Sequence, residues 1–180
     1  MNLSATPLSV IVMGVSGCGK SSVGQALADA LAGSFADGDD FHTPKNIDNM
    51  ANGIALTDED RLPWLSTINA FLRTADVNDG ANVVACSALK RSYRDVLAEE
   101  VPIFFVHLAG SFDLIEARSK ARENHFMSVD LLKSQFDTLE PLGSDEWAVT
   151  LDIDNSLDTI VDQALKAVRE HELYLSSRSH

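Results

Sequence analysis

The fold can be read from eight residues near the N-terminus, Gly14-Val15-Ser16-Gly17-Cys18-Gly19-Lys20-Ser21. They fit the pattern Gly-x-x-x-x-Gly-Lys-(Ser/Thr), the P-loop that wraps the phosphates of a nucleotide. The glycines permit a tight loop whose backbone N–H groups can point at phosphate oxygens. Lys20 is expected to place its ammonium against the β- and γ-phosphates, and Ser21 to ligate Mg²⁺ through its hydroxyl. The stretch therefore predicts binding of ATP with Mg²⁺.

The residues on either side of this loop have the context that a P-loop requires. An apolar run, residues 9–15, reads as a buried strand, and an amphipathic helical pattern follows from Val23 to Leu31. The helix would point the positive end of its dipole at the phosphates. The residues expected to contact the nucleotide are Gly14, Ser16, Gly17, Cys18, Gly19, Lys20, Ser21 and Ser22.

Further apolar runs alternate with helical patterns along the chain. The runs read as strands at residues 35–37, 82–86, 103–108 and 148–153. Pro63 suits the first turn of a middle helix, and Ser156 is placed to cap the last one. The alternation predicts a three-layer α/β fold with a mainly parallel, five-stranded sheet. We expect one domain, residues 8–170, with short tails at 1–7 and 171–180.

Two long polar stretches do not fit simple connections between strand and helix. Residues 40–62 follow the second strand, and residues 118–147 follow the helix after the fourth. Long insertions at this end of an α/β sheet commonly bind substrate or close over it. We therefore expect a substrate-binding segment at about 40–62 and a helical lid at about 118–147.

The acidic stretch Asp37-Gly38-Asp39-Asp40 supplies candidate catalytic carboxylates. P-loop GTPases and motors usually carry their Mg²⁺ aspartate after a later strand, but no aspartate follows residues 82–86 here. If the segment is extended, alternation puts Asp37 and Asp39 on one face. Asp37 would then serve Mg²⁺, and Asp39 would take the proton of the acceptor hydroxyl. A plain acidic turn is the alternative.

Composition limits the remaining classes of function. The net charge of −13 provides little for a nucleic-acid surface, and no run of apolar residues is long enough for a membrane span. Residues 1–12 lack the features of a signal peptide, so we expect a cytoplasmic protein. Cys18 and Cys86 are too few for a disulfide framework and are expected to be buried thiols.

Beyond the P-loop, several segments resemble the bacterial-type gluconate kinases, a family of small P-loop kinases. The resemblance runs in order from about residue 8 to 170. Its segments are MGVSGCGKSSV (13–23), DGDDFH (37–42), KNIDNMANGIALTDEDRLPWL (45–65), CSALKRSYRD (86–95), RSKARENHFM (118–127) and LLKSQFDTLEPLG (131–143). One departure is Asn124, where the family usually has glycine.

The resemblance implies transfer of phosphate from ATP to gluconate by a cytoplasmic homodimer with a mobile lid. Gluconate carries hydroxyls and one carboxylate, so its site needs hydrogen-bonding groups and cations. Asp39 and His42 are candidates for the hydroxyls, Arg61, Lys90 and Arg94 for the carboxylate, and His125 is a further substrate candidate in the lid. By resemblance, Arg118 would stack on adenine and Arg122 would stabilise the transferring phosphoryl group.

Plainer interpretations of these residues remain open. Lys90 and Arg94 are spaced as a solvated helix face, Arg61 could pair with Asp58, and Arg118 with Arg122 could be a surface pair. Trp64 suits a core or pocket wall better than a stacking platform. Other functions also remain, namely a kinase of shikimate or of a nucleoside monophosphate, or a nucleotide-binding module without catalysis.

Overall fold

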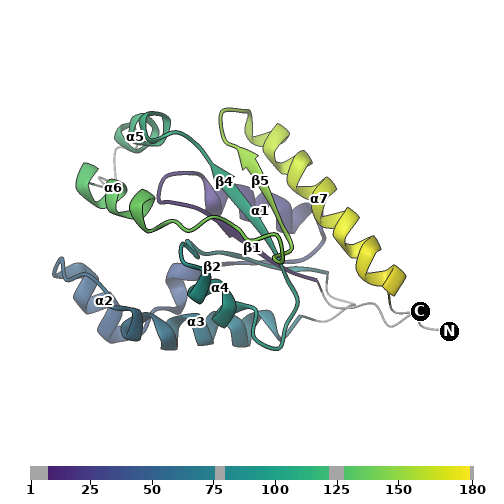
Figure 1. Ribbon diagram of the computed structural model, residues 1–180, viewed down its shortest axis with the longest axis horizontal. Helices are drawn as coiled ribbons and strands as arrows, with labels where there is room; N and C mark the ends of the chain where they lie inside the picture. The colour runs from purple at the N-terminus through teal and green to yellow at the C-terminus, as the bar shows by residue number, and fades with distance from the viewer. Residues whose placement is uncertain (1–7, 76–79, 122–127, 179–180) are drawn as a thin grey trace.

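Five parallel strands form the central sheet of the computed structural model, which describes residues 8–75, 80–121 and 128–178. The strands are β1 (Ser9–Met13), β2 (Ser34–Asp37), β3 (Asn82–Ala85), β4 (Ile103–Ala109) and β5 (Ala148–Asp152). They lie in the order β2-β3-β1-β4-β5 (Figure 1). The predicted five-stranded parallel sheet is confirmed. β1 ends two residues before the predicted limit, because Gly14 has a φ of 145° and turns the chain into the loop.

The alternation of side chains along β1 builds two cores, one on each face of the sheet. Val10 and Val12 pack on the face covered by α1 (Lys20–Ala30) and α7 (Leu157–Arg178). Ile11 and Met13 pack on the opposite face, beneath α3 (Asp58–Leu72) and α4 (Arg91–Leu97). Figure 1 shows the sheet between these two pairs of helices. All four β1 side chains are fully buried, so the predicted three layers are confirmed.

Two of the helix starts are explained by capping side chains. The Ser156 hydroxyl accepts a hydrogen bond from the backbone N–H of Thr159, as expected for an N-cap of α7. α3 begins earlier than its proline suggested, because Thr57 and Asp60 form a capping box. Pro63 therefore lies inside α3, and its predicted place in the first turn is wrong.

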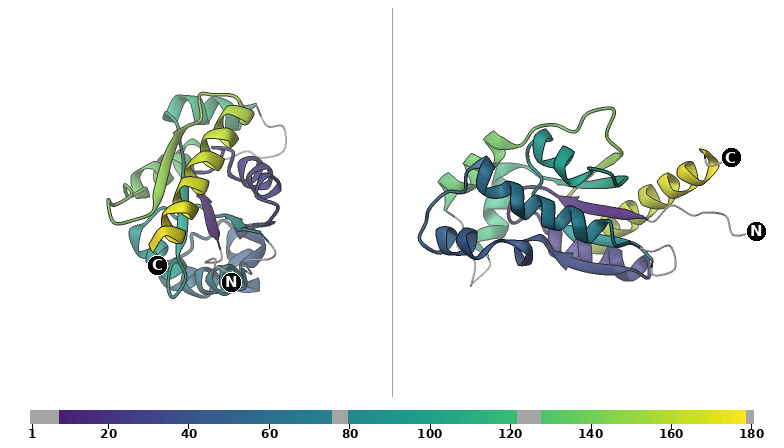
Figure 2. Two further views of the ribbon diagram at one scale, coloured as in Figure 1. Left: turned by 90° about the vertical axis from the view of Figure 1, so that its right-hand side faces the viewer. Right: turned by 90° about the horizontal axis from the view of Figure 1, so that it is seen from below.

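Four short elements gather at the end of the molecule where the strands have their carboxyl ends. They are η1 (Gly38–Phe41), α2 (Pro44–Ala51), α5 (Phe112–Lys120) and α6 (Val129–Thr138) (Figures 1 and 2). The stretch 40–62 covers part of η1, α2 and the start of α3, while the stretch 118–147 covers the end of α5 and α6. Among the described residues, no helix has the length and apolar character needed to cross a bilayer.

Candidate active site

The loop of residues 14–19 has the backbone of a phosphate-binding loop. Gly14, Gly17 and Gly19 all have positive φ angles, of 145°, 82° and 96°. A Cβ at Gly14 would lie 2.8 Å from the carbonyl oxygen of Leu108, so the position also excludes a side chain on steric grounds. The Lys20 ammonium donates to the Val15 carbonyl at 2.9 Å, which closes the loop around the first turn of α1.

The loop leaves the sheet where ligands of parallel α/β proteins usually bind. β1 lies between β3 and β4, so the connections from β1 and its neighbours diverge to opposite sides of this point. The backbone N–H of Gly14 donates to the Ser87 carbonyl at 3.3 Å, which joins the loop to the chain after β3. The parallel strands β1, β2 and β3 therefore end on the same side of the sheet as the P-loop.

Ser21 and Asp37 form a pair that fits Mg²⁺ held with a nucleotide. The Ser21 hydroxyl donates to Asp37 Oδ2 at 2.8 Å. Mg²⁺ binds through one or two protein oxygens together with phosphate oxygens and water, so a hydroxyl beside a carboxylate suits it. Over the described ranges, no group of three or more His, Cys, Asp or Glu residues could hold a metal by itself.

The acidic stretch after β2 is not extended as expected. Asp37 Oδ1 accepts a hydrogen bond from the backbone N–H of Asp39 at 3.0 Å and caps the short helix η1. The expectation that Asp37 and Asp39 share one face of an extended segment is therefore wrong, because the chain turns directly after Asp37. The turn alternative is right about the shape. It does not decide the function, because the same turn brings Asp37 and Asp39 close together.

Asp39 is exposed, as is its neighbour Asp40, and its charge acts on two nearby residues. Burial raises the pKa of the Cys86 thiol to about 12, and nearby Lys20 lowers it while Asp39 and Asp37 raise it. These three charged groups therefore lie near Cys86, the residue after β3. Asp39 also acts on the pKa of His42, opposing the effect of burial. Asp39 thus lies among the other candidate groups.

His42 is held by packing on one side and by an amide on the other. Its ring stacks on Trp64 with centroids 4.2 Å apart, and Trp64 Nε1 donates to the Gly38 carbonyl at 2.7 Å. The buried Asn46 donates to the Asp60 carbonyl at 2.8 Å and lies 3.5 Å from His42 Nδ1. Burial, with a smaller effect from Arg61, lowers the pKa of His42. A neutral imidazole is the result, which can hydrogen-bond a hydroxyl. Trp64 is buried and belongs to the core, as expected.

Two of the three predicted cations converge on a single carboxylate. Lys90 Nζ lies 3.0 and 3.1 Å from the two oxygens of Asp58, and Arg61 Nη1 lies 3.8 Å from Asp58 Oδ1. The hydroxyl of Tyr93 also donates to Asp58. The local pairing of Arg61 with Asp58 is therefore present. Lys90 precedes α4 as its N-cap residue and does not share a solvated helix face with Arg94.

Arg94 is not available to a substrate, and its predicted place in the site is wrong. Its side chain is fully buried, and Nε lies 2.6 Å from Glu146 Oε1. The two terminal nitrogens donate to Glu146 Oε2 and to the carbonyls of Ala88, Leu89, Glu140 and Pro141. Arg94 thus ties α4 to the chain before β5 and has no donor directed at the P-loop.

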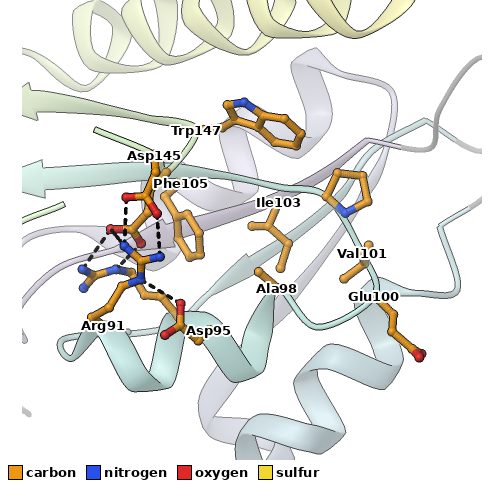
Figure 3. A pocket seen from close by; sticks show the side chains of 12 residues that line it. Arg91, Asp95, Ala98, Glu100, Val101, Ile103, Phe105, Asp145 and Trp147 are labelled. Carbon is orange, nitrogen blue, oxygen red and sulfur yellow. Dashed lines mark hydrogen bonds and ion pairs between the residues drawn. The ribbon is translucent and has the colours of Figure 1, made fainter. Parts of the chain in front are cut away.

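A pocket of about 390 Å³ lies beside Arg94, near the start of β4, whereas the P-loop follows the carboxyl end of β1. Ile103, the first residue of β4, lines it together with Phe105 and Trp147 (Figure 3). At its rim Arg91 is paired with Asp95 at 2.7 Å and with Asp145 at 2.8 Å. These ion pairs neutralise Arg91, the partly exposed cation at the rim of the pocket. The pocket is therefore not the candidate phosphate site.

The predicted lid residues are described only in part. Arg118 Nη2 donates to the Ile153 carbonyl at 2.8 Å, which holds the end of α5 near the chain after β5. Arg118 therefore lies on a helix next to the P-loop, since Ile115 of α5 is 3.4 Å from the position that a Cβ at Gly17 would take. Arg122 and His125 lie outside the described residues.

One residue that the sequence analysis did not single out reaches into the P-loop. Gln135 of α6 accepts a hydrogen bond from the backbone N–H of Ser16, with 2.7 Å between nitrogen and Oε1. It belongs to a segment that carried the family resemblance, LLKSQFDTLEPLG (131–143), but nothing in its spacing indicated a contact with a loop far away in the sequence.

Three features together define a P-loop kinase of a small molecule. They are the phosphate-binding loop, the pair of Ser21 and Asp37 beside it, and the further carboxylate of Asp39. Comparison with known proteins agrees. The family model described as shikimate kinase matches residues 16–169. The thermosensitive gluconokinase of Escherichia coli is 43% identical over 162 residues, covering 89% of this chain and 87% of that protein. The gluconokinase of Gluconobacter oxydans is 40% identical, covering 89% and 90%.

Solved structures extend the comparison. The crystal structure of a gluconokinase from Sinorhizobium meliloti 1021 has a TM-score of 0.88 and 44% identity, and it covers 97% of this chain and 98% of that one. A shikimate kinase from Aquifex aeolicus has a TM-score of 0.58 at 12% identity, so it shares the fold alone. The chain belongs to the gluconokinase family.

Proposed function

We propose that this protein transfers the γ-phosphoryl group of ATP to the 6-hydroxyl of D-gluconate, giving 6-phospho-D-gluconate and ADP. The observation that carries the proposal is that Asp37 accepts hydrogen bonds from the P-loop hydroxyl of Ser21 and from the backbone N–H of Asp39. The cations Arg61 and Lys90, which meet at Asp58, supply a cationic end. The family relatives named above act on gluconate. A sugar acid needs both parts of this arrangement, a phosphoryl-transfer centre and a cationic end.

Each group has a role in the transfer. The N–H groups of the P-loop and the Lys20 ammonium hold the β- and γ-phosphates and balance their charge. Ser21 and Asp37 would hold Mg²⁺, which supplies further positive charge to the phosphate oxygens when it is bound with ATP. Asp39 orients the acceptor hydroxyl and takes its proton. The bond from O6 to the γ-phosphorus forms as the bond between that phosphorus and the bridging oxygen of ADP breaks.

The rest of the site orients the substrate and excludes water. His42, neutral because of its burial, is suited to hydrogen-bond gluconate hydroxyls. Arg61 and Lys90 are suited to attract the carboxylate at the far end. We assign Arg118 and Arg122 to the nucleotide side, His125 to the substrate side and the segment 118–147 to a lid. A cytoplasmic location and a homodimer complete the proposal, as implied by the family resemblance.

Shikimate is the second candidate acceptor, because the matching family model carries that description. Shikimate also carries one carboxylate and several hydroxyls, so the same polar groups could serve it. Against it, the solved shikimate kinases share only 12–13% identity with this chain.

A coupled assay of ADP release separates the candidates. ATP and Mg²⁺ would be supplied with gluconate, with other sugar acids or with shikimate, and kcat/KM compared. We expect gluconate to exceed shikimate by at least about a hundredfold, because a site that fits one pattern of hydroxyls leaves polar groups unpaired with another. A shikimate rate equal to or above the gluconate rate would overturn the assignment of substrate.

A further inference from the structure

Arg61 and Lys90 share one counter-ion, and this cluster lies next to the candidate transfer site. Asp58 binds Lys90 through both carboxylate oxygens and lies 3.8 Å from Arg61. Tyr93 contributes a hydrogen bond to Asp58, and its ring lies under both cations, 5.7 Å from the Arg61 guanidinium carbon and 5.4 Å from Lys90 Nζ. Asn46 connects the cluster to His42, because its amide nitrogen lies 3.5 Å from His42 Nδ1 and donates to the carbonyl of Asp60, the residue before Arg61. The cluster therefore borders the groups proposed to hold gluconate hydroxyls.

The charge of the cluster has a definite value at neutral pH. The hydrogen bonds from Tyr93 and Lys90 hold the pKa of Asp58 below its usual value, so this carboxyl is ionised. Burial and the neighbouring Asp58 raise the pKa of Tyr93, so the phenol is neutral. Two cations and one anion leave a net charge of one positive unit. A single carboxylate would neutralise it.

The two cations differ in the donors that they leave available. Lys90 is directed at Asp58. Among the described residues, the hydrogen bonds and the ion pair of Arg61 all involve Nη1, which donates to the Leu56 carbonyl at 2.7 Å. The Nε and Nη2 edge of Arg61 has no hydrogen-bond partner in that part of the chain. This edge is the fork that binds a carboxylate through two parallel hydrogen bonds.

We propose that Asp58 is a specificity-determining residue that sets the charge of the acceptor head group. By neutralising Lys90 it leaves Arg61 as one effective cation, so the site prefers a head group with one negative charge and gains little from a second. The proposal rests on the proposed function, since it assumes that the polyol chain extends from this cluster toward Asp39. It assigns a role to a carboxylate that would otherwise only compete with the substrate for its cations.

The test measures binding against head-group charge. Three ligands share one polyol chain, namely gluconamide (neutral), gluconate (one negative charge) and glucitol with a phosphate in place of the carboxylate (about two negative charges at pH 7.5). Dissociation constants are measured by calorimetry on the full chain, wild type and Asp58→Asn. Asparagine keeps the shape, and its one carbonyl oxygen can still accept hydrogen bonds from Tyr93 and Lys90 as Oδ1 does, whereas the contact of Lys90 with Oδ2 is lost.

We expect Asp58→Asn to bind gluconamide as the wild type does and to bind gluconate about three- to tenfold more tightly. The phosphate analogue should gain about ten- to a hundredfold, because each added charge meets one more unit of uncompensated positive charge in a partly screened site. If gluconate instead binds more weakly and the trend with charge does not steepen, Asp58 only positions the two cations and the proposal is wrong.

Two control variants separate charge from geometry. Tyr93→Phe removes the hydrogen bond to Asp58 but keeps its charge, and Asp162→Asn removes one negative charge from the exposed side of α7. Neither should steepen the trend, and a steeper trend in either would contradict the proposal. Wild-type turnover of gluconate is measured in parallel. Failure of that turnover would count against the proposed function, whereas an unchanged trend in an active enzyme would count against Asp58 alone.

Discussion

Asp39 and Asp40 are neighbouring aspartates, and the sequence separated them by an alternation that the structure does not show. In η1 the chain turns, so alternation along a strand no longer applies. The structural reason for choosing Asp39 is that its backbone N–H donates to Asp37, which is also bonded to the P-loop hydroxyl of Ser21, and that its charge acts on the pKa of His42. The choice remains the same for a different reason, and it can be tested directly.

Asp39→Asn should still bind ATP with Mg²⁺ but lose at least about a hundredfold in kcat, because the amide keeps the shape and cannot take a proton. Asp40→Asn is the matched control and should lose little. Steady-state rates of ADP release, with nucleotide affinity measured separately, check this. An inactive Asp40→Asn beside an active Asp39→Asn would refute the assignment of the base.

The buried ion pair of Arg94 could not be predicted from the sequence. Its spacing from Lys90 indicated a common helix face, but the partner that decides its role, Glu146, lies 52 positions further along the chain. No periodicity links the two, so the ion pair could not be predicted. The P-loop residues, in contrast, were predictable because their spacing is fixed by the phosphates that such a loop binds.

Arg94→Met should therefore affect stability before it affects substrate affinity. Removing one partner of a buried ion pair costs up to about 3–5 kcal/mol, and it leaves the Glu146 carboxylate with Arg91, 3.7 Å away, as its remaining cation. Urea unfolding at neutral pH measures the free energy of unfolding. The double variant Arg94→Met with Glu146→Gln should recover part of the loss. A fully stable Arg94→Met protein with a raised KM for gluconate would return Arg94 to the substrate site.

At the scale of elements, the sheet was more predictable than the segments that carry the site. Strands buried on both faces appear as short apolar runs, and all five were found within about two residues of their limits. The one-turn helix η1 and the early start of α3 were missed, because side-chain caps at Asp37 and Thr57 decide them. α6 was expected only as part of a lid, yet its Gln135 is bonded to the P-loop.

This contact makes α6 a support for the phosphate-binding loop. The side chain of Leu132 is buried in the core, and Phe136 packs on Phe112 of α5 with ring centroids 5.5 Å apart. Gln135 between them accepts the hydrogen bond from the backbone N–H of Ser16. Gln135→Leu should raise the KM for ATP by about two- to tenfold, the value of one lost hydrogen bond, with a smaller change in the KM for gluconate.

Gln163→Leu, the same change on the exposed face of α7, is the control and should leave both constants unaltered. Initial rates over a grid of both substrate concentrations give the two values. If Gln135→Leu raises only the KM for gluconate, α6 serves the acceptor and not the nucleotide.

For the whole molecule, three histidines make stability depend on pH. Burial lowers the pKa of His42, His107 and His171 below 6.5. Below about pH 6.5 the unfolded chain therefore takes up protons that the folded chain resists, so the free energy of unfolding falls as the pH falls. At lower pH the carboxyl of Asp60, whose pKa is lowered to about 2 chiefly by Lys45, adds to the loss.

Urea unfolding at pH 7.5, 6.0 and 5.0 should show this decline. His171→Phe keeps an aromatic ring beside Trp147 and Phe104 and removes one titrating group, so its decline should be shallower than that of the wild type. Equal slopes for the two proteins would mean that His171 does not contribute.

The proposed reaction forms a bond between O6 of gluconate and the γ-phosphorus of ATP, and the structure of the product shows whether this bond forms. ATP, Mg²⁺ and D-gluconate would be incubated with the protein, and the mixture examined by phosphorus NMR with proton coupling. Transfer to the 6-hydroxyl should give a phosphate monoester whose phosphorus signal is split into a triplet by the two hydrogens of carbon 6. The amount of this ester should equal the amount of ADP formed. Inorganic phosphate without an ester, or an ester on another carbon, would contradict the proposed reaction.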